Sequence, residues 1–417
     1  MAKQVLKTND LLFCTRPFFE ATKVLTYNFL DIAFSPYDNH WKEMRKVFVS
    51  ELLGPTRAGL FNDVTEMEIE ALVQSISSHP SGTAINLNNK LLALVFAVMC
   101  KVAFGKSYRE EPFRGATLKD MLDEAKNMLG GSIGDHLPIL GRSLDKLSGW
   151  NDRLKKCFGN LDGYVQMVLD EHLSEISDNG DQKDFVHVLI ELSSRNNANG
   201  SYGLTKDDMK ALIMDVLTGG TDTIVVTMVW AMSEIIRNPR VMQKLQHEIR
   251  TCIGRKPKIQ RSDIMQMKYL KMVVKETLRL HPPAPLLIPR ECMNDCQVGG
   301  YNVFRGTRVL INAWAIGRDP RIWGDNSTQF YPERFLNVEA DFVGENFDMV
   351  PFGGGRRSCP AFSQAATTVE LTLGNLLYFF DWEVGDGLKN EELNMEEKGS
   401  LVVFRKSSLS LVPTKHN

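Results

Sequence analysis

The chain has 417 residues, of which 43% are hydrophobic and 24% charged, an ordinary balance for a globular protein whose core needs no disulfide or structural metal. Its 49 Lys and Arg residues against 51 Asp and Glu residues give a formal net charge of -2, which argues against a general nucleic-acid-binding protein. Seven cysteines, odd in number and widely spaced, argue against a secreted disulfide framework. The one close pair, Cys292 and Cys296, lacks the matching Cys/His pair of a zinc site. With no disulfide framework indicated, a reducing compartment is expected.

Apolar residues spaced by three and four predict amphipathic helices through the first half of the chain. The predicted ranges are Leu60–Ser78, Asn88–Phe104, Leu118–Met128, Trp150–Ile176 and Phe185–Leu192. The most apolar run, Leu91–Cys100, is too short to cross a bilayer and is predicted to be a buried core helix. The N-terminus lacks the apolar stretch of a signal peptide.

A much longer helix is predicted from an N-cap at Thr205 to Arg237, where Asn238-Pro239 ends it. Apolar residues surround almost its whole circumference, so the helix is predicted to be buried. Its middle nevertheless carries Gly219-Gly220-Thr221-Asp222-Thr223. Each glycine costs about 1 kcal/mol relative to alanine in a helix interior, and a buried Asp222 needs a partner.

The last part of the chain mixes helices with short strands. Helices are predicted at Val241–Ile253, Ile264–Leu280 and Phe362–Phe379, and strand-like runs at Leu286–Arg290, Thr307–Ala313, Leu401–Phe404 and Ser408–Val412. The sequence therefore predicts a mainly α fold with small β-sheets.

A glycine-rich turn carries Cys359 in the sequence Phe352-Gly-Gly-Gly-Arg-Arg-Ser-Cys359-Pro360. Pro360 can open the following helix, so Cys359 is predicted to lie just before a helix N-terminus, where the helix dipole favours a thiolate. Arg356 and Arg357 add positive potential. From this stretch alone, an anionic sulfur ligand to a metal and a plain buried cysteine both remain open. No Gly-Lys-Ser/Thr follows, which excludes a P-loop.

Other charged residues are weaker signals on their own. Glu276 and Arg279 share one helix face, and Arg334 follows in Pro332-Glu-Arg-Phe335, so the three could form a bidentate network or only a surface pair. Trp41 and Arg45 lie one helical turn apart, which places Arg45 within reach of an anionic group or simply on an amphipathic face. Arg290, at the end of an apolar strand-like run, is a similar case.

The motifs around Gly219–Thr223, Glu276–Arg279, Pro332–Phe335 and Phe352–Cys359 together resemble the cytochrome P-450 family of haem-thiolate monooxygenases, in that family's order and spacing. The resemblance runs from Met1 to Asn417, and its detail is similar to the plant A-type microsomal branch. It implies one catalytic domain over residues 1–417, with the long central helix over the haem. Against that family, the N-terminal membrane anchor, the hinge and the first strands are expected to be missing.

The resemblance implies a role for each matched residue. Cys359 corresponds to the thiolate ligand of haem b (iron protoporphyrin IX), and Phe352 packs near it and tunes the iron's potential. Thr223 and Asp222 correspond to the alcohol–acid pair that delivers protons while O₂ is activated. Contacts to the haem propionates are implied for Trp41, Arg45, Arg357 and, as a further candidate, Arg290. The network of Glu276, Arg279 and Arg334 is implied to brace the haem-binding core.

The implied reaction inserts one oxygen atom from O₂ into a small apolar plant metabolite, with electrons from NADPH-cytochrome P-450 reductase. The family implies the cytosolic face of the endoplasmic reticulum and peripheral membrane contact, and no nucleic acid is expected. Two alternatives remain: a truncated, haem-binding but inactive member, and a haem-thiolate isomerase or dehydratase, against which Asp222-Thr223 counts. The chain departs from the family at Ala361, usually glycine, and at Lys398-Gly399-Ser400, usually an apolar turn, so the substrate is not fixed by analogy.

Overall fold

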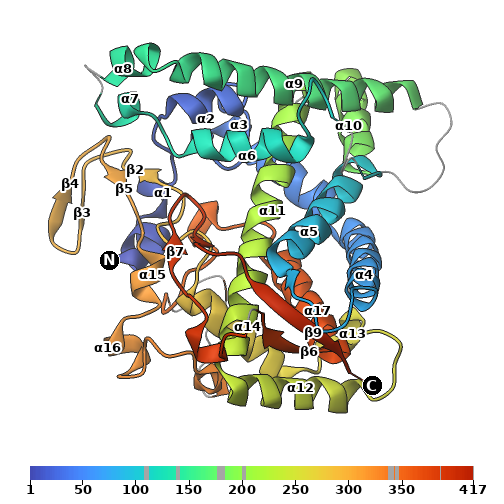
Figure 1. The fold of residues 1–417 in the computed structure, drawn as a ribbon. Coiled ribbons are helices and arrows are strands. Elements are labelled where there is room, and N and C mark those ends of the chain that lie inside the picture. The colour runs from blue at the N-terminus through green and yellow to red at the C-terminus, as the bar shows by residue number, and fades with distance from the viewer. Residues whose placement is uncertain are drawn as a thin grey trace.

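The computed structural model describes residues 1–416 except 108–111, 138–140, 176–183, 200–202, 337–341, 343–346 and 386. Helices dominate, and helix α11 (Lys206–Arg237) runs through the middle of the molecule (Figure 1). The other helices are α1 (Asp10–Phe13), α2 (Glu20–Leu25), α3 (Asn39–Val47), α4 (Pro55–Ser77), α5 (Leu87–Phe104), α6 (Leu118–Leu129), α7 (Ile133–His136), α8 (Gly141–Leu147), α9 (Trp150–Glu175), α10 (Phe185–Asn199), α12 (Pro239–Ile253), α13 (Arg261–Ile264), α14 (Lys268–Leu280), α15 (Ala313–Ile316), α16 (Pro320–Trp323) and α17 (Phe362–Phe379).

Helix α11 begins and ends where local capping chemistry predicts. The Thr205 side chain accepts a hydrogen bond from the backbone N–H of Asp208 at 3.1 Å, and the Asp208 carboxylate accepts one from the N–H of Thr205 at 2.8 Å. This capping box satisfies two N–H groups that a helix start leaves unpaired. At about 1.5 Å per residue the helix is about 48 Å long, and it packs against α5, α14 and α17.

Helices α5 and α11 are both long and apolar enough to cross a membrane by length and composition. Their most apolar windows are, however, 67% and 72% buried within the fold, as expected for core helices. The predicted buried helix around Leu91–Cys100 is therefore confirmed as part of the core that α5 forms with α4 and α11. Figure 1 shows α9 crossing one end of α11 and α12 crossing the other.

The strands form small sheets, as predicted, but the strands differ in length and position from the predicted ranges. All of the pairings between described strands are antiparallel. A three-stranded sheet has the order β1 (Ile85–Asn86), β9 (Ser410–Lys415), β6 (Phe380–Val384), with Ile85 opposite Leu411 and Trp382 opposite Pro413. Three two-stranded sheets pair β2 (Arg290–Glu291) with β5 (Arg308–Val309), β3 (Cys296–Val298) with β4 (Tyr301–Val303), and β7 (Glu397–Lys398) with β8 (Phe404–Arg405).

Several predicted boundaries were wrong, because short strands are defined by a partner far away in the sequence. Only Arg290 of the run Leu286–Arg290 is paired, and the run Thr307–Ala313 gives a two-residue strand followed by α15. Strand β6 was missed, although Phe380, Trp382 and Val384 alternate into the core. The predicted helix Ile264–Leu280 is interrupted at 265–267.

Candidate haem-thiolate active site

The turn that carries Cys359 depends on two left-handed glycines. Gly353 and Gly355 have φ angles of 74° and 67°, a region that other residues rarely adopt. A side chain at Gly355 would collide with the Leu6 carbonyl oxygen and with Asp10. The backbone N–H of Cys359 then donates to the Phe352 carbonyl at 2.9 Å, which closes the turn before α17 begins at Phe362. The predicted position of Cys359, shortly before a helix N-terminus, is confirmed.

The surroundings of Cys359 suit a ligand to a cation. Burial raises the pKa of its thiol, while the backbone N–H of Ala361 and the positive charge of Arg45 oppose this shift. Arg45 is held there by its hydrogen bond to the Ser358 carbonyl, at 2.7 Å. A metal ion bound to the sulfur would supply the further stabilisation that a thiolate needs at this buried position. Position 361 carries alanine where the family usually has glycine. Its φ angle of -100° is one that alanine adopts without strain.

The ring centres of Phe352 and Phe362, the first residue of α17, lie 6.2 Å apart, with the rings tilted by 59°. The Phe352 carbonyl oxygen accepts the Cys359 N–H, so its backbone closes the turn that carries the thiol. The predicted packing of the Phe352 ring near the sulfur, which would tune the potential of a bound metal, stays a prediction.

Arg357 is buried and gathers three backbone carbonyls. Its guanidinium donates to Cys14, Ile32 and Ser35 at 2.6, 3.2 and 2.5 Å, and it lies 4.3 Å from the centre of the Trp41 ring. None of these hydrogen-bond acceptors is charged, and two of the five guanidinium N–H groups are not used by them. Burial lowers the pKa of Arg357 to about 10.

Trp41 and Arg290 lie in the same region but already have partners. The Trp41 indole N–H donates to the Ile32 carbonyl at 3.0 Å. Arg290 donates to the Gly354 carbonyl at 2.9 Å and pairs with Asp10 at 3.4 Å. Their predicted contacts to haem propionates stay predictions, because these partners account for the orientation of both side chains.

Arg16 belongs to this cluster, and the sequence reasoning missed it. It donates to the carbonyls of Ala33, Ile288 and Pro289 at 2.9 to 3.0 Å. Burial and the nearby charges of Arg357 and Arg290 lower its pKa well below the ordinary value. A charged residue among the apolar neighbours Phe13, Cys14 and Pro17 was the available signal.

The middle of α11 is open on one face at Gly219. Gly219 is exposed although the residues around it in this core helix are largely buried, and a Cβ built on it meets nothing within 4 Å. The Thr223 hydroxyl lies on the same face and donates to the Gly219 carbonyl at 2.8 Å. This arrangement provides an alcohol and free space on one face of the central helix.

Asp222 points to a different partner from the one expected. Its carboxylate pairs with Lys126 of α6 at 2.8 Å, and no contact between described residues joins it to the Thr223 hydroxyl. Adjacent residues on a helix point about 100° apart, which explains the separation. Burial raises the pKa of Asp222, and Lys126 limits that rise. Sequence reasoning missed Lys126, since nothing local to α6 indicates its partner.

Three observations indicate that the residues near Cys359 and the open face of α11 fit a haem. A single thiol lies in a turn before a helix, Gly219 leaves open space on α11, and four arginines (Arg16, Arg45, Arg290, Arg357) gather near the turn. Asp10 pairs with Arg290, while burial raises the pKa of Asp31 to about 6 and that of Asp215 well above its usual range. Among the described residues, an ion pair gives a carboxylate partner to Arg290 alone of the four arginines, and the other three donate to backbone carbonyls, as suits two propionate groups.

The predicted network of Glu276, Arg279 and Arg334 is present and completely buried at its centre. Arg279 forms two hydrogen bonds of 2.7 Å to Glu276, and Arg334 adds bonds of 2.9 and 3.1 Å. The backbone N–H of Tyr331 also donates to Glu276 at 2.7 Å. The network joins α14 to the segment 317–334, so its role here is structural.

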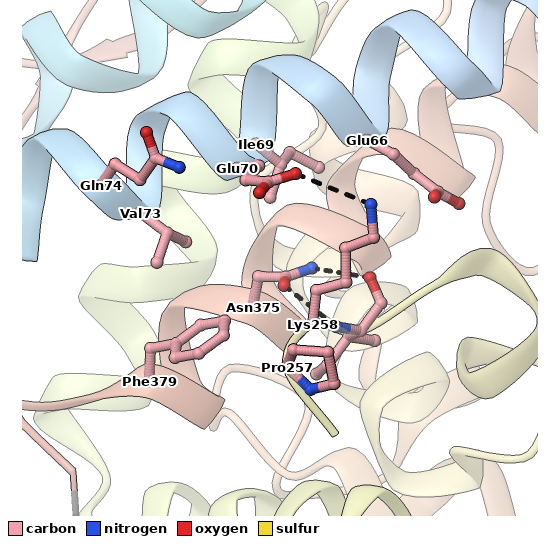
Figure 2. A pocket seen from close by; sticks show the side chains of 10 residues that line it. Glu66, Ile69, Glu70, Val73, Gln74, Pro257, Lys258, Asn375 and Phe379 are labelled. Atoms are coloured by element: carbon pink, nitrogen blue, oxygen red, sulfur yellow. Dashed lines mark hydrogen bonds and ion pairs between the residues drawn. The ribbon is translucent and has the colours of Figure 1, made fainter. Parts of the chain in front are cut away.

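A small cavity of about 160 Å³ lies between α4, the segment 257–259 and the end of α17 (Figure 2). Lys258 reaches across it to Glu70 at 3.6 Å, and Asn375 binds the backbone of Ile259. Asn375 lies about 20 Å along α17 from Phe362, at 1.5 Å per residue. The cavity is therefore separate from the turn of Cys359.

A thiol in a closed turn before a helix, together with a long central helix that is open at a glycine, is the arrangement expected of the haem-thiolate class of protein. A sequence model of the cytochrome P-450 family matches residues 1–411, and the chain belongs to this family of haem-thiolate monooxygenases.

Its relatives include plant enzymes. Parthenolide synthase of Tanacetum parthenium is 57% identical over 417 residues, which covers 100% of this chain and 81% of that protein. Eupatolide synthase of Helianthus annuus is 43% identical with the same coverage of both. A solved zebra fish cytochrome P-450 with abiraterone superimposes with a TM-score of 0.81 at 24% identity, covering 100% of this chain and 92% of that one, and supports the fold alone.

Proposed function

We propose that residues 1–417 form one catalytic domain that inserts an oxygen atom from O₂ into a small apolar plant terpenoid. The observation that carries the proposal is the position of Cys359, in a closed turn before α17 and beside Arg45. When bound through Cys359, haem supplies the redox chemistry that activates O₂, since a thiolate ligand pushes electron density onto the iron. In this proposal Arg357, Arg45 and Trp41 hold the propionates, with Arg290 and Arg16 as further donors.

The chain's own part in the reaction is to bind, orient and supply protons. Thr223 holds a proton on its Oγ1 atom, which now donates to the Gly219 carbonyl and needs only a rotation to face the open side of α11. Asp222, whose pKa burial raises, takes up a proton closer to neutral pH than an exposed carboxylate does. Lys126 connects Asp222 to α6 and to the protein surface, so the proposed path starts at Lys126 and Asp222. Because Asp222 does not contact the Thr223 hydroxyl, the last step to Thr223 requires a bridging water molecule.

The substrate class follows from the relatives and from the apolar lining of the proposed pocket. The names of the two plant relatives refer to parthenolide and eupatolide. We infer that four segments line the substrate pocket, and they are mostly apolar: Leu30–Pro36, Val216–Thr223, Ala284–Leu287 and Gly399–Val402. The polar Ser400 in the last of these is engaged locally, since its hydroxyl donates to the Val402 carbonyl at 2.6 Å. An apolar terpenoid with few polar groups suits such a lining.

Electrons are proposed to come from an NADPH-dependent reductase at the cytosolic face of the endoplasmic reticulum, where plant relatives of this kind typically reside. Lys42 and Lys46 lie one turn apart and exposed on α3, whose Arg45 binds the Ser358 carbonyl next to Cys359. Two exposed cations next to the thiol turn suit an acidic partner surface. Charge reversal at both lysines is expected to slow reductase-supported turnover without changing reduction by dithionite.

The test is the spectrum of the purified ferrous protein with carbon monoxide. The wild-type protein and the matched control Cys252→Ala, which changes an exposed cysteine, should both show the strongly red-shifted Soret band of thiolate ligation. Cys359→Ala should lose this band or the haem itself. A band typical of histidine ligation in the wild-type protein, or an unchanged band in Cys359→Ala, would overturn the assignment. Substrate-induced spectral shifts across a panel of plant terpenoids and other metabolites test the substrate class separately.

A further inference from the structure

A second group of chemistry-bearing side chains lies between α9 and α10, away from Cys359. His172 comes from the end of α9, while Asp184 and His187 come from the start of α10. One ligand atom from each of the three lies within 4.8 Å of the others. We propose that these residues form a zinc site that fastens α9 to α10.

The spacing of the ligand atoms is close to that of a tetrahedral metal site. The Oδ2 atom of Asp184 lies 3.1 Å from Nε2 of His172 and 2.9 Å from Nδ1 of His187. In tetrahedral zinc sites with bonds of about 2.0–2.1 Å, two ligand atoms are about 3.3 Å apart. An increase of a few tenths of an ångström in each distance would therefore make room for the ion. Zinc sites with three protein ligands leave the fourth position to water.

The hydrogen bonds of His172 hold its ring in an orientation that a metal ligand also needs. Its Nδ1 atom lies 2.7 Å from the Val168 carbonyl oxygen, which accepts only, so Nδ1 carries a proton. Nε2 lies 3.1 Å from Oδ2 of Asp184, where a proton on Nε2 bonds the carboxylate in the absence of an ion and a zinc ion would replace that proton. Histidine ligands of metals commonly donate their other N–H to a backbone carbonyl in this way.

Asp184 divides its two oxygens between two tasks. Oδ1 caps α10 by accepting the backbone N–H of His187 at 3.0 Å. Helix capping thus accounts for Oδ1 but not for the position of Oδ2, which faces both imidazole rings.

His187 lacks the hydrogen bonds that a buried imidazole normally makes. Its side chain is 11% exposed, and neither ring nitrogen has a hydrogen bond to a described residue. The contact of Nδ1 with Asp184 is short but lacks the alignment of a hydrogen bond. The two rings lie edge to face with centroids 4.6 Å apart, and one nitrogen of each faces the same point, the Oδ2 atom of Asp184. A zinc ion at that point would pair both groups and would lock the end of α9 to the start of α10.

The experiment uses the haem-loaded full chain. After treatment with EDTA, the protein is incubated with Zn²⁺, passed through gel filtration and analysed for metal by mass spectrometry, which separates zinc from haem iron. The wild-type protein should retain about one zinc more per chain than His172→Gln and His187→Gln, with at least tenfold weaker binding in each variant. The control His247→Gln changes an exposed histidine on α12 and should behave as wild type.

Thermal unfolding provides the second measurement. Zn²⁺ should raise the melting temperature of the wild-type protein and of His247→Gln, whereas Mg²⁺, which prefers oxygen ligands, should not. If a variant cannot be purified with haem, the wild-type comparison of Zn²⁺ with Mg²⁺ decides. The proposal is overturned by zinc that is washed away on gel filtration, by retention equal in the three variants, or by a melting temperature that does not respond to Zn²⁺.

Discussion

The two adjacent glycines of α11 provide a matched pair of substitutions with opposite expected effects. A Cβ added at Gly219 meets nothing within 4 Å, whereas one added at Gly220 would lie 2.6 Å from the Sδ atom of Met99 on α5. Both replacements by alanine gain about 1 kcal/mol of helix propensity. Only Gly220→Ala must also displace the Met99 side chain, which is buried in the core with 3% of its surface exposed. Overpacking of this kind typically costs about 1–3 kcal/mol.

The net free energy of unfolding should therefore rise by about 1 kcal/mol in Gly219→Ala and fall by up to about 2 kcal/mol in Gly220→Ala. An unfolding entropy of about 2.1 cal/mol/K per residue gives about 0.9 kcal/mol/K for a chain of this length. The melting temperature should rise by about 1 °C in the first variant and fall by about 2 °C in the second. The methyl group of Gly219→Ala also enters the open space beside Thr223, so this stabilised variant should bind substrate more weakly.

The assay is thermal unfolding of the haem-loaded protein at a fixed scan rate, combined with a titration of the substrate-induced spectral shift. A fixed rate matters because large proteins often unfold irreversibly. If Gly219→Ala lowers the melting temperature as much as Gly220→Ala does, the face of α11 at Gly219 is not open. Unchanged substrate affinity in Gly219→Ala would show that the open space is not part of the substrate pocket.

Three further predictions concern other polar side chains. Glu276→Gln should leave Arg279 and Arg334 without a carboxylate and cost about 3–5 kcal/mol, measured as faster loss of haem on heating, while Glu396→Gln in an exposed pair should change stability by less than about 0.5 kcal/mol. Burial raises the pKa of Glu370 to about 7, so its ionisation opposes folding once the pH exceeds the unfolded value near 4.5; Glu370→Gln should raise the melting temperature at pH 8 and hardly at pH 4, and an equal gain at both would contradict this. Thr223→Ala and Lys126→Met should both increase the peroxide released per reductant consumed, and full coupling in both variants would exclude the proposed proton path.

The parts of the site that local sequence determines could be predicted. Helix α17 spans the predicted range Phe362–Phe379, and α11 begins after its predicted cap at Thr205, because capping and apolar periodicity act within one or two turns. The turn of Cys359 was predictable for the same reason, since its glycines and Pro360 are adjacent in the sequence.

The parts of the site that join distant segments could not be predicted. Lys126 has an ordinary place on an amphipathic helix, and only the packing of α6 near α11 brings it to Asp222. Arg16 binds carbonyls of two segments far from it in the sequence, at Ala33 and at Ile288 and Pro289, which no local pattern encodes. Short strands such as β2 and β5 likewise exist only because each finds the other.

The three carbonyls bound by Arg357 have a consequence for the order of events during synthesis. Their hydrogen bonds join residues 322, 325 and 343 positions apart, so the segments around Cys14, Ile32 and Ser35 must wait for the thiol turn to leave the ribosome. Contacts of such long range form late, because closing long loops is entropically slow. We therefore expect the nascent chain to be unable to capture its cofactor until nearly all of it has been translated, which makes cofactor capture one of the last steps in maturation.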